Sequence, residues 1–178
     1  MKLIKGQNKL VSEILELVKL NGGVPLQGME PVNIRHCVES ALEPLSPLME
    51  SKGQALAMDV DDDIACVLDG RLFSKVLSNV LANAAQNSPC GAEIRIGATN
   101  GPERVRLTVW NGGVEIPEGM LPSLCEPFYR ADEARTSGEG RSGLGLAIVK
   151  KALDLMQVGF TIRNEDGGVL FQMDIESD

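Results

Sequence analysis

Hydrophobic residues recur at helical spacing near the start of the chain. Within residues 3–20 the apolar positions follow alternating steps of three and four, with one glutamine as the exception: Leu3, Leu10, Ile14 and Leu17. This spacing is typical of a coiled-coil seam. It is equally typical of an amphipathic helix that packs on its own domain. Both alternatives stay open for this helix.

The same periodicity predicts further helices over residues 34–51, 70–87 and 144–157. The first of them contains Pro44 and Pro47, which should kink or divide it because proline cannot donate the helical hydrogen bond. The second is preceded by Asp69, a residue type that caps helix N-termini. We therefore expect one broken helix and two continuous ones after residue 30.

Short or alternating apolar runs predict strands over residues 54–60, 64–68, 93–98, 104–110, 158–163 and 169–175. The two strands that flank Asn100-Gly101 should form a hairpin. Strands and helices follow one another in an irregular order, which favours an α+β fold over regular βαβ winding. We expect a two-layer α/β sandwich: a mixed sheet of about five strands, covered on one face by three helices, with the N-terminal helix in addition.

Composition favours a single globular domain with a small appendage. The chain has 178 residues, of which 43% are apolar and 24% charged, with a net charge of −8. This acidic balance argues against nucleic acid or an anionic membrane surface as a partner, because both carry negative charge. A phosphate ligand would need a local binding device.

Cysteine spacing and hydropathy exclude several other classes. The four cysteines stand far apart, at Cys37, Cys66, Cys90 and Cys125, with no C-x-x-C pair and no nearby histidine. Neither a zinc site nor a thioredoxin-like motif is indicated. No signal peptide is recognisable, and no apolar run approaches the roughly 20 residues of a membrane helix. We expect reduced thiols and a soluble, cytoplasmic segment.

The first motif with possible chemistry lies on the predicted helix 70–87. Asn79 and Asn83 are four residues apart, so their side chains project from one helical face, with Gln86 and Asn87 one turn further on. Such a face could hold hydrated Mg²⁺ and phosphate oxygens, because Mg²⁺ prefers oxygen ligands. A solvated helix face near a helix end is the alternative.

The second motif is the segment 111–117, Asn-Gly-Gly-Val-Glu-Ile-Pro, directly after a predicted strand. The Asn111 amide could pair with an adenine edge as asparagine does in DNA recognition. Two glycines would allow the backbone to approach a flat base closely. An ordinary turn is the alternative interpretation.

The third motif, residues 140–150, is a glycine-rich loop that opens the last predicted helix. Free N–H groups and the helix dipole favour an anion there. Arg130, Arg135 and Arg141 could add charge-assisted hydrogen bonds to phosphate. Residues 126–151 carry five basic and four acidic side chains, against the acidic background of the chain. A flexible connection between two elements is the alternative.

These motifs, in this order, resemble the ATP-binding catalytic domain of two-component sensor histidine kinases, from Glu30 to Ile175. The matching segments are the N box with Asn79 and Asn83, the first glycine box at 111–117, the F box at 126–130, the second glycine box at 140–146, and the final glycine motif at 168–171. The resemblance implies a Bergerat-type (GHKL) α/β sandwich. It also implies ATP and Mg²⁺ as ligands beneath a mobile lid, residues 118–142.

The resemblance implies a role for each matching residue. Asn83 would be the Mg²⁺ ligand and Asn79 its neighbour on the phosphate side. Asn111 would bind adenine, with Gly113 and Ile116 lining the base. Arginines and the backbone of the second glycine box would hold the phosphates, and two aromatic residues would anchor the lid. The remaining implied binding residues are Gln86, Asn87, Phe128, Tyr129, Arg130, Arg135, Arg141, Ser142, Gly143, Leu144, Gly145 and Leu146.

The chain also departs from the family pattern. Asn111 replaces the usual aspartate, Glu115 the second glycine, Val169 a common threonine and Gln86 a frequent lysine or histidine. Similar changes occur together in some sensor kinases of Gram-positive type. Relatives that hydrolyse ATP, such as gyrase, place a glutamate general base at the position of Asn79. An amide cannot take a proton from water, so we expect weak spontaneous hydrolysis.

The expected phosphoacceptor is missing. Such kinases phosphorylate a histidine followed by Glu-x-x-x-Pro on a dimerisation hairpin, whereas His36 precedes Cys-Val-Glu. We expect three segments: the end of a hairpin helix at 1–23, a linker at 24–29 and the catalytic domain at 30–178. By resemblance, the whole protein would be a homodimer at the bacterial plasma membrane. It would transfer phosphate to its own or its partner subunit's hairpin, for relay to a response regulator.

Two other functions remain open. A serine kinase of the anti-sigma-factor type shares this fold, although the F box argues against it. A non-catalytic pseudokinase, acting through protein contacts, would result if the altered positions had weakened ATP binding.

Overall fold

The computed structural model describes residues 2–23, 26, 28–129 and 142–176. Its helices are α1 (Lys2–Asn21), α2 (Ile34–Leu42), α3 (Ser46–Ser51), α4 (Gly70–Asn87) and α5 (Gly145–Met156), with 3₁₀ turns η1 (Glu43–Leu45) and η2 (Glu118–Ser123). Its strands are β1 (Glu30–Asn33), β2 (Ala55–Asp59), β3 (Ala65–Leu68), β4 (Glu93–Asn100), β5 (Arg104–Gly112), β6 (Gly159–Glu165) and β7 (Gly168–Glu176).

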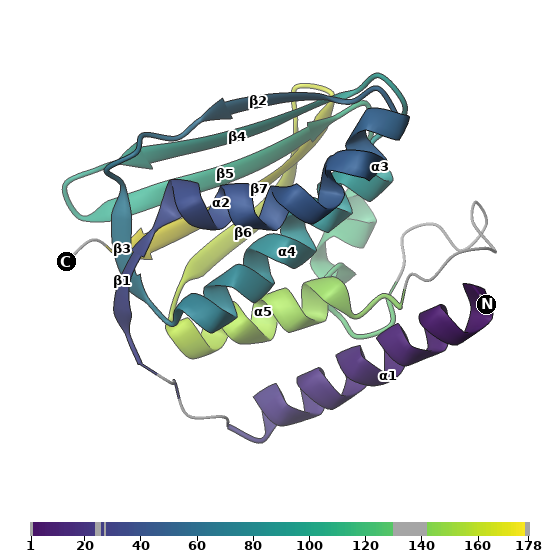
Figure 1. The fold of residues 1–178 in the computed structure, drawn as a ribbon, viewed down its shortest axis with the longest axis horizontal. Helices are drawn as coiled ribbons and strands as arrows, with labels where there is room; N and C mark the ends of the chain where they lie inside the picture. The colour runs from purple at the N-terminus through teal and green to yellow at the C-terminus, as the bar shows by residue number, and fades with distance from the viewer. Residues whose placement is uncertain (1, 24–25, 27, 130–141, 177–178) are drawn as a thin grey trace.

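A five-stranded mixed sheet in the order β2-β4-β5-β7-β6 forms one layer. Only the β2–β4 pair is parallel, and the β4–β5 hairpin is the one expected about Asn100-Gly101. Helices α2, α4 and α5 lie side by side over one face of this sheet (Figure 1). The expected two-layer α+β sandwich is therefore confirmed.

Strand alternation decides which sheet face meets the helices. Along β5, Val105, Leu107 and Val109 are all buried, whereas Arg104 and Arg106, which alternate with them, are exposed. The β7 residues opposite the three apolar positions are buried too: Ile175, Met173 and Phe171. Because side chains alternate along a strand, this single register fixes the helix-facing surface of the sheet.

The first domain helix is divided where its prolines stand. Helix α2 ends at Leu42, the 3₁₀ turn contains Pro44, and α3 begins with Pro47 in its first turn. Proline is tolerated in the first turn of a helix, where its missing N–H would have no partner, but not inside one. The break therefore falls where the sequence predicts.

The strands around the acidic turn 61–63 do not pair with one another. Strand β2 joins the large sheet beside β4, whereas β3 pairs with β1 in a separate two-stranded sheet. Strand β1 is not predicted from the sequence, because four residues that include Pro31 carry too short a pattern. Residues 30–33 form a strand because they pair with β3, although their own sequence does not indicate one.

Helix α1 lies beside α5 (Figure 1). Its end packs on the domain: Leu20 is buried, Leu17 is partly buried against the core, and Glu16 forms a 2.7 Å ion pair with Lys75 of α4. Leu10 and Ile14, two positions of the predicted seam, remain 37% and 38% exposed. Packing on its own domain is thus confirmed for the end of this helix. No helix within the described residues has the length and apolar character needed to cross a membrane.

Asp69 caps α4 as predicted, and its removal should destabilise the domain. The side chain is 2% exposed and accepts a 3.0 Å hydrogen bond from the Leu72 N–H. Asp69→Ala leaves that N–H without its partner, so we expect a loss of about 1–2 kcal/mol in the free energy of unfolding. Urea denaturation measures it. Asp69→Asn, which keeps an acceptor oxygen, is the matched control and should lose clearly less. Equal losses for both variants would contradict the capping role.

Candidate functional site

A cavity of about 300 Å³ lies between α4, the start of α5, the segment 114–117 and the helix-facing side of the sheet. Apolar side chains from both helices, from three strands and from the segment after β5 line much of it: Val80, Ala82, Ala84, Val109, Val114, Ile116, Pro117, Leu124, Leu146, Ile162, Val169 and Phe171. The largest group of polar side chains comes from α4: Asn79, Asn83, Gln86 and Asn87. Concave, largely apolar cavities with a few convergent polar groups are the usual sites for small ligands.

The last turn of α4 is held by two side chains from the α3–β2 connection. Lys52 Nζ donates to the carbonyl oxygens of Ala85, Gln86 and Ser88 at 2.8–3.0 Å. Gln54 Nε2 donates to the carbonyl oxygens of Ala85 and Ser88, both at 3.0 Å. Carbonyls at a helix C-terminus have no helical partner, and a cation there is favoured by the helix dipole. These contacts fix the part of α4 whose polar side chains line the cavity.

Asn79 lies where α4 meets the start of α5. Its Nδ2 donates to the Lys75 carbonyl oxygen at 2.9 Å, and its Oδ1 lies 3.0 Å from where a Cβ on Gly145 would be. The amide oxygen of Asn79 therefore faces the first turn of α5. Gly145 permits this approach because it has no side chain.

The N-terminus of α5 opens on the cavity. The residue before it, Leu144, provides no side-chain cap, and Ser142, Gly143, Gly145 and Leu146 all line the cavity. The Leu144 N–H donates to Ser142 Oγ at 3.1 Å. Unpaired N–H groups at the start of a helix attract an anion, and the helix dipole adds to this attraction.

Gly143 shapes the loop before α5. Its φ is +69°, a conformation that favours glycine. An added Cβ would lie 3.0 Å from the carbonyl carbon of Phe128 and 3.0 Å from the carbonyl oxygen of Tyr129. The Gly143 carbonyl oxygen also accepts a 3.0 Å hydrogen bond from the Phe128 N–H. The segments on either side of residues 130–141 are thereby brought together at the cavity.

Asn111 lies near the end of β5, on the same face of the strand as the buried Val105, Leu107 and Val109. Its neighbour Trp110 is on the outer face, where the Arg95 guanidinium stacks 3.8 Å from the ring centroid and the indole N–H donates to the Glu165 carbonyl oxygen at 2.8 Å. Gly112 and Gly168 leave room for this ring. The anchored tryptophan fixes the strand end that carries Asn111.

The segment after β5 is fixed by one side chain. Asn164 of β6 accepts from the Ile116 N–H at 2.9 Å and donates to the Ile116 carbonyl oxygen at 2.6 Å. These two bonds hold Ile116 at the cavity wall. Gly113 has φ +78°, and a Cβ added there would lie 2.8 Å from the Pro89 ring. The absence of a side chain at this position therefore allows the turn to lie close to Pro89.

Most predicted site residues meet at this one cavity. Those that line it are Asn79, Asn83, Gln86, Asn87, Asn111, Ile116, Tyr129, Ser142, Gly143, Gly145 and Leu146. Three described residues do not line it: Gly113 contacts Pro89, Leu144 is buried beneath the loop, and the Phe128 side chain is 60% exposed. Arg130, Arg135, Arg141 and most of the predicted lid lie outside the described residues.

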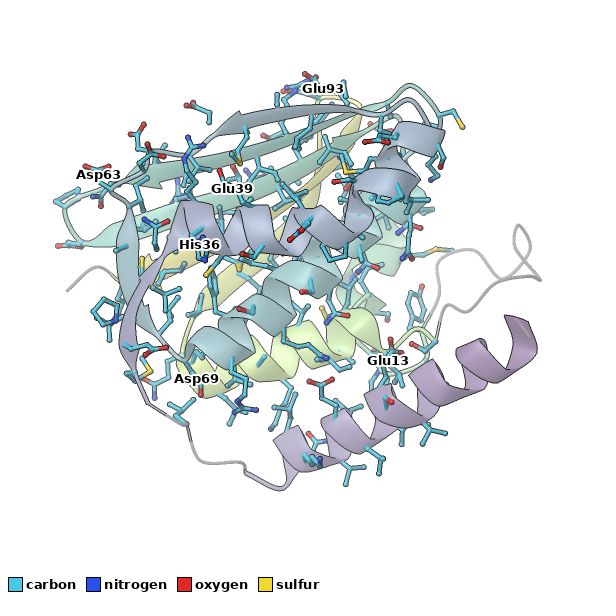
Figure 2. All side chains as sticks on the ribbon, in the orientation of Figure 1. Glu13, His36, Glu39, Asp63, Asp69 and Glu93 are labelled. Carbon is cyan, nitrogen blue, oxygen red and sulfur yellow. The ribbon has the colours of Figure 1, made fainter. Side chains whose placement is uncertain are left out.

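Glu13 is a cavity residue that sequence reasoning did not find. It comes from α1, and its side chain lies on the side of that helix facing the rest of the domain (Figure 2). Its Oε2 accepts a hydrogen bond from the Ser142 hydroxyl. No local pattern relates these two positions, which are 129 residues apart, so only the packing of α1 brings them together.

The oxygen atoms that line the cavity could hold a hard cation such as Mg²⁺ only if a bound ligand supplied further oxygen ligands. Within the described residues no group of three or more histidine, cysteine, aspartate or glutamate side chains could hold a metal. The amide oxygens of Asn79 and Asn83 are suitable Mg²⁺ or water partners, because Mg²⁺ keeps several waters and shares ligands with phosphate. Cys125, near the cavity, is no thiolate candidate, since burial raises its pKa.

The part of the chain that forms most of this cavity matches a known protein family. The model of the histidine kinase-, DNA gyrase B- and HSP90-like ATPases matches residues 68–177. The sensor protein VanSB of Enterococcus faecalis is 44% identical over 174 residues, which are 98% of this chain and 39% of VanSB. The chain thus spans well under half of that relative.

Solved structures share the fold. Full-length ShkA in complex with AMPPNP superposes with a TM-score of 0.79 at 24% identity, covering 94% of this chain and 35% of ShkA. The histidine kinase ThkA, in complex with the response regulator protein TrrA, superposes with a TM-score of 0.77 at 20% identity, covering 98% of this chain and 48% of ThkA. The family match spans α4, α5 and all the strands around the cavity, and the chain belongs to the histidine kinase-, DNA gyrase B- and HSP90-like ATPases.

Proposed function

We propose that this chain is the ATP-binding catalytic part of a sensor histidine kinase, which donates the γ-phosphoryl group of ATP to a histidine outside it. The observation that carries the proposal is the single cavity that joins the amides of α4, the amide at the end of β5 and the uncapped start of α5. The similarity to VanSB, a sensor protein, supports the histidine kinase branch of the family.

The phosphates would lie where α5 begins. Helix N–H groups bind anions without a lysine, which explains how an acidic chain can hold a triphosphate. Asn83 would hold Mg²⁺, which when bound neutralises phosphate charge and orients the transferred group. Asn79, whose oxygen faces the same helix start, would position a water of that ion. The predicted arginines Arg130, Arg135 and Arg141 would add charge-assisted bonds.

The base would occupy the apolar part of the cavity. Val109, Ile162 and Phe171 of the sheet and Val80 of α4 offer flat contact area to a purine ring. Asn111 supplies the amide that would bind the adenine edge. This division follows from the chemistry of ATP, whose base is apolar on its faces and polar only at its edges.

Transfer to a side chain is favoured over hydrolysis. Hydrolysis needs a general base that takes a proton from water, and the amide of Asn79 cannot act so. The ThkA–TrrA complex supports a response regulator as the downstream partner. We further propose that residues 1–23, which include α1, are the end of a dimerisation hairpin helix, and that the whole protein is a membrane-bound homodimer.

The nucleotide site predicts a Mg²⁺-dependent effect at Asn83. Asn83→Ala should weaken ATP binding about tenfold or more in Mg²⁺, because one ion contact is lost. In EDTA the variant and the unchanged chain should bind alike. Isothermal titration calorimetry measures both conditions. Ser78→Ala, an exposed change on the same helix, is the control. Equal affinity of Asn83→Ala and the unchanged chain in Mg²⁺ would place the cation elsewhere.

The loop before α5 predicts a second effect. Gly143→Val introduces a Cβ against the Phe128 and Tyr129 backbone at a positive φ, so the loop must shift and ATP binding should fall at least about tenfold. The control is Gly159→Ala, because nothing lies within 4 Å of its added Cβ. Thermal unfolding monitors the fold of both variants. Full affinity in Gly143→Val would contradict the assignment of the phosphate site.

Glu13 predicts a gain of function. Its carboxylate lies at Ser142, beside the proposed phosphate position, so it should repel a triphosphate. Glu13→Gln should strengthen ATP binding about threefold to tenfold at low ionic strength, with a smaller gain in high salt. Glu16→Gln, on the same helix but bound to Lys75 outside the cavity, is the matched control. Unchanged or weaker binding in Glu13→Gln would contradict this electrostatic role.

The isolated chain should not phosphorylate itself. His36 is exposed on α2 and does not line the cavity. Incubation with γ-labelled ATP should leave the protein without acid-labile label and release little inorganic phosphate. Label that disappears in His36→Gln would show that the acceptor assignment is wrong.

A further inference from the structure

Three half-buried asparagines are oriented by hydrogen bonds, whereas the side chain of the buried Asn111 is not. Asn164 is oriented by a backbone donor and a backbone acceptor, both on Ile116. Asn79 is oriented by the Lys75 carbonyl oxygen, and Asn33 by the Asp62 carbonyl oxygen and the His36 N–H. Among the described residues, none forms a hydrogen bond with the Asn111 side-chain amide. This amide is free to present either its oxygen or its NH₂ group.

The strands on either side of Asn111 place no polar side chain directly opposite it. Asn111 is 9% exposed and lines the cavity. The residues directly opposite it on the neighbouring strands are Ile94 and Val169, both apolar and buried. A buried amide with no protein partner needs one from the ligand.

An amide and a carboxylate recognise purines differently. Adenine presents a 6-amino donor beside the N1 acceptor, and a 6-oxopurine presents an O6 acceptor beside an N1–H donor. The oxygen and NH₂ of one asparagine match adenine in one orientation and the 6-oxopurine after half a turn about χ2. An ionised aspartate only accepts, so it faces the O6 of a 6-oxopurine with another acceptor.

We infer that the cavity accepts 6-oxopurine nucleoside triphosphates as well as ATP, with Asn111 as the residue that makes this possible. The inference rests on the proposed nucleotide site and specifies its substrate class. It follows from the unfixed amide and its apolar neighbours.

Inosine triphosphate is the cleanest probe, because it differs from ATP only at position 6 and at the N1 proton. Displacement of a fluorescent ATP analogue in Mg²⁺ would give the ratio of the ITP and ATP dissociation constants. We expect the unchanged chain to bind ITP within about tenfold of ATP. In Asn111→Asp that ratio should widen by about tenfold to a hundredfold, the range for losing a two-bond match to a base edge.

The outcomes separate the two proposals. No ATP binding by the unchanged chain would overturn the nucleotide site itself. ATP binding with ITP more than about tenfold weaker would leave the site standing and overturn this inference. If the ratio of the ITP and ATP dissociation constants were unchanged in folded Asn111→Asp, Asn111 would not be the residue that allows ITP to bind. Because the ratio is taken within each protein, partial unfolding of a variant cancels. The ratio for the unchanged chain decides the inference even if Asn111→Asp does not fold.

Discussion

The close packing of α4 against the start of α5 is the constraint on which the cavity depends. Asn79 can turn its oxygen toward α5 only because Gly145 has no Cβ, and the last turn of α4 is fixed by Lys52 and Gln54. The C-terminus of α4 and the N-terminus of α5 differ in how their backbone groups are bonded. The carbonyl end of α4 is satisfied by side-chain donors, whereas the N–H end of α5 has no side-chain cap and faces the cavity. A helix N-terminus of this kind favours an anion.

The sheet supplies the other half of the site through its alternation. The inner face of β5 carries a run of buried apolar residues that is followed by Asn111. The boundary between the hydrophobic core and the cavity therefore lies at this residue. On the outer face Trp110 is held by Arg95 and Glu165, which rigidifies the same strand end. The proposed base-binding amide thus lies on a strand that is anchored on its outer face, and rigid strands position functional groups more accurately than free loops do.

Sequence patterns predicted the helices, most strands and the order of the binding motifs with little error. Asp69, Pro44 and Pro47 act locally, through capping and missing donors, so their effects are visible without a fold. Strand β1 and the partner of β3 were not predictable, because pairing joins residues that are distant along the chain. The closeness of Gly113 to Pro89 was not predictable for a related reason, because only the folded turn brings the two residues together.

The sequence by itself determined the periodicities, the caps and the asparagine and glycine motifs that indicate an ATP-binding fold, since each depends on neighbours within a few residues. Only the tertiary structure decided that Glu13 of α1 reaches Ser142, that Lys52 closes α4, and that the Asn111 amide has no fixed partner among the described residues. The first places a negative charge at the cavity, the second fixes one of its walls, and the third is the basis of the proposed base selectivity. They depend on contacts across long stretches of chain, and such contacts form only when the hydrophobic core brings the layers together.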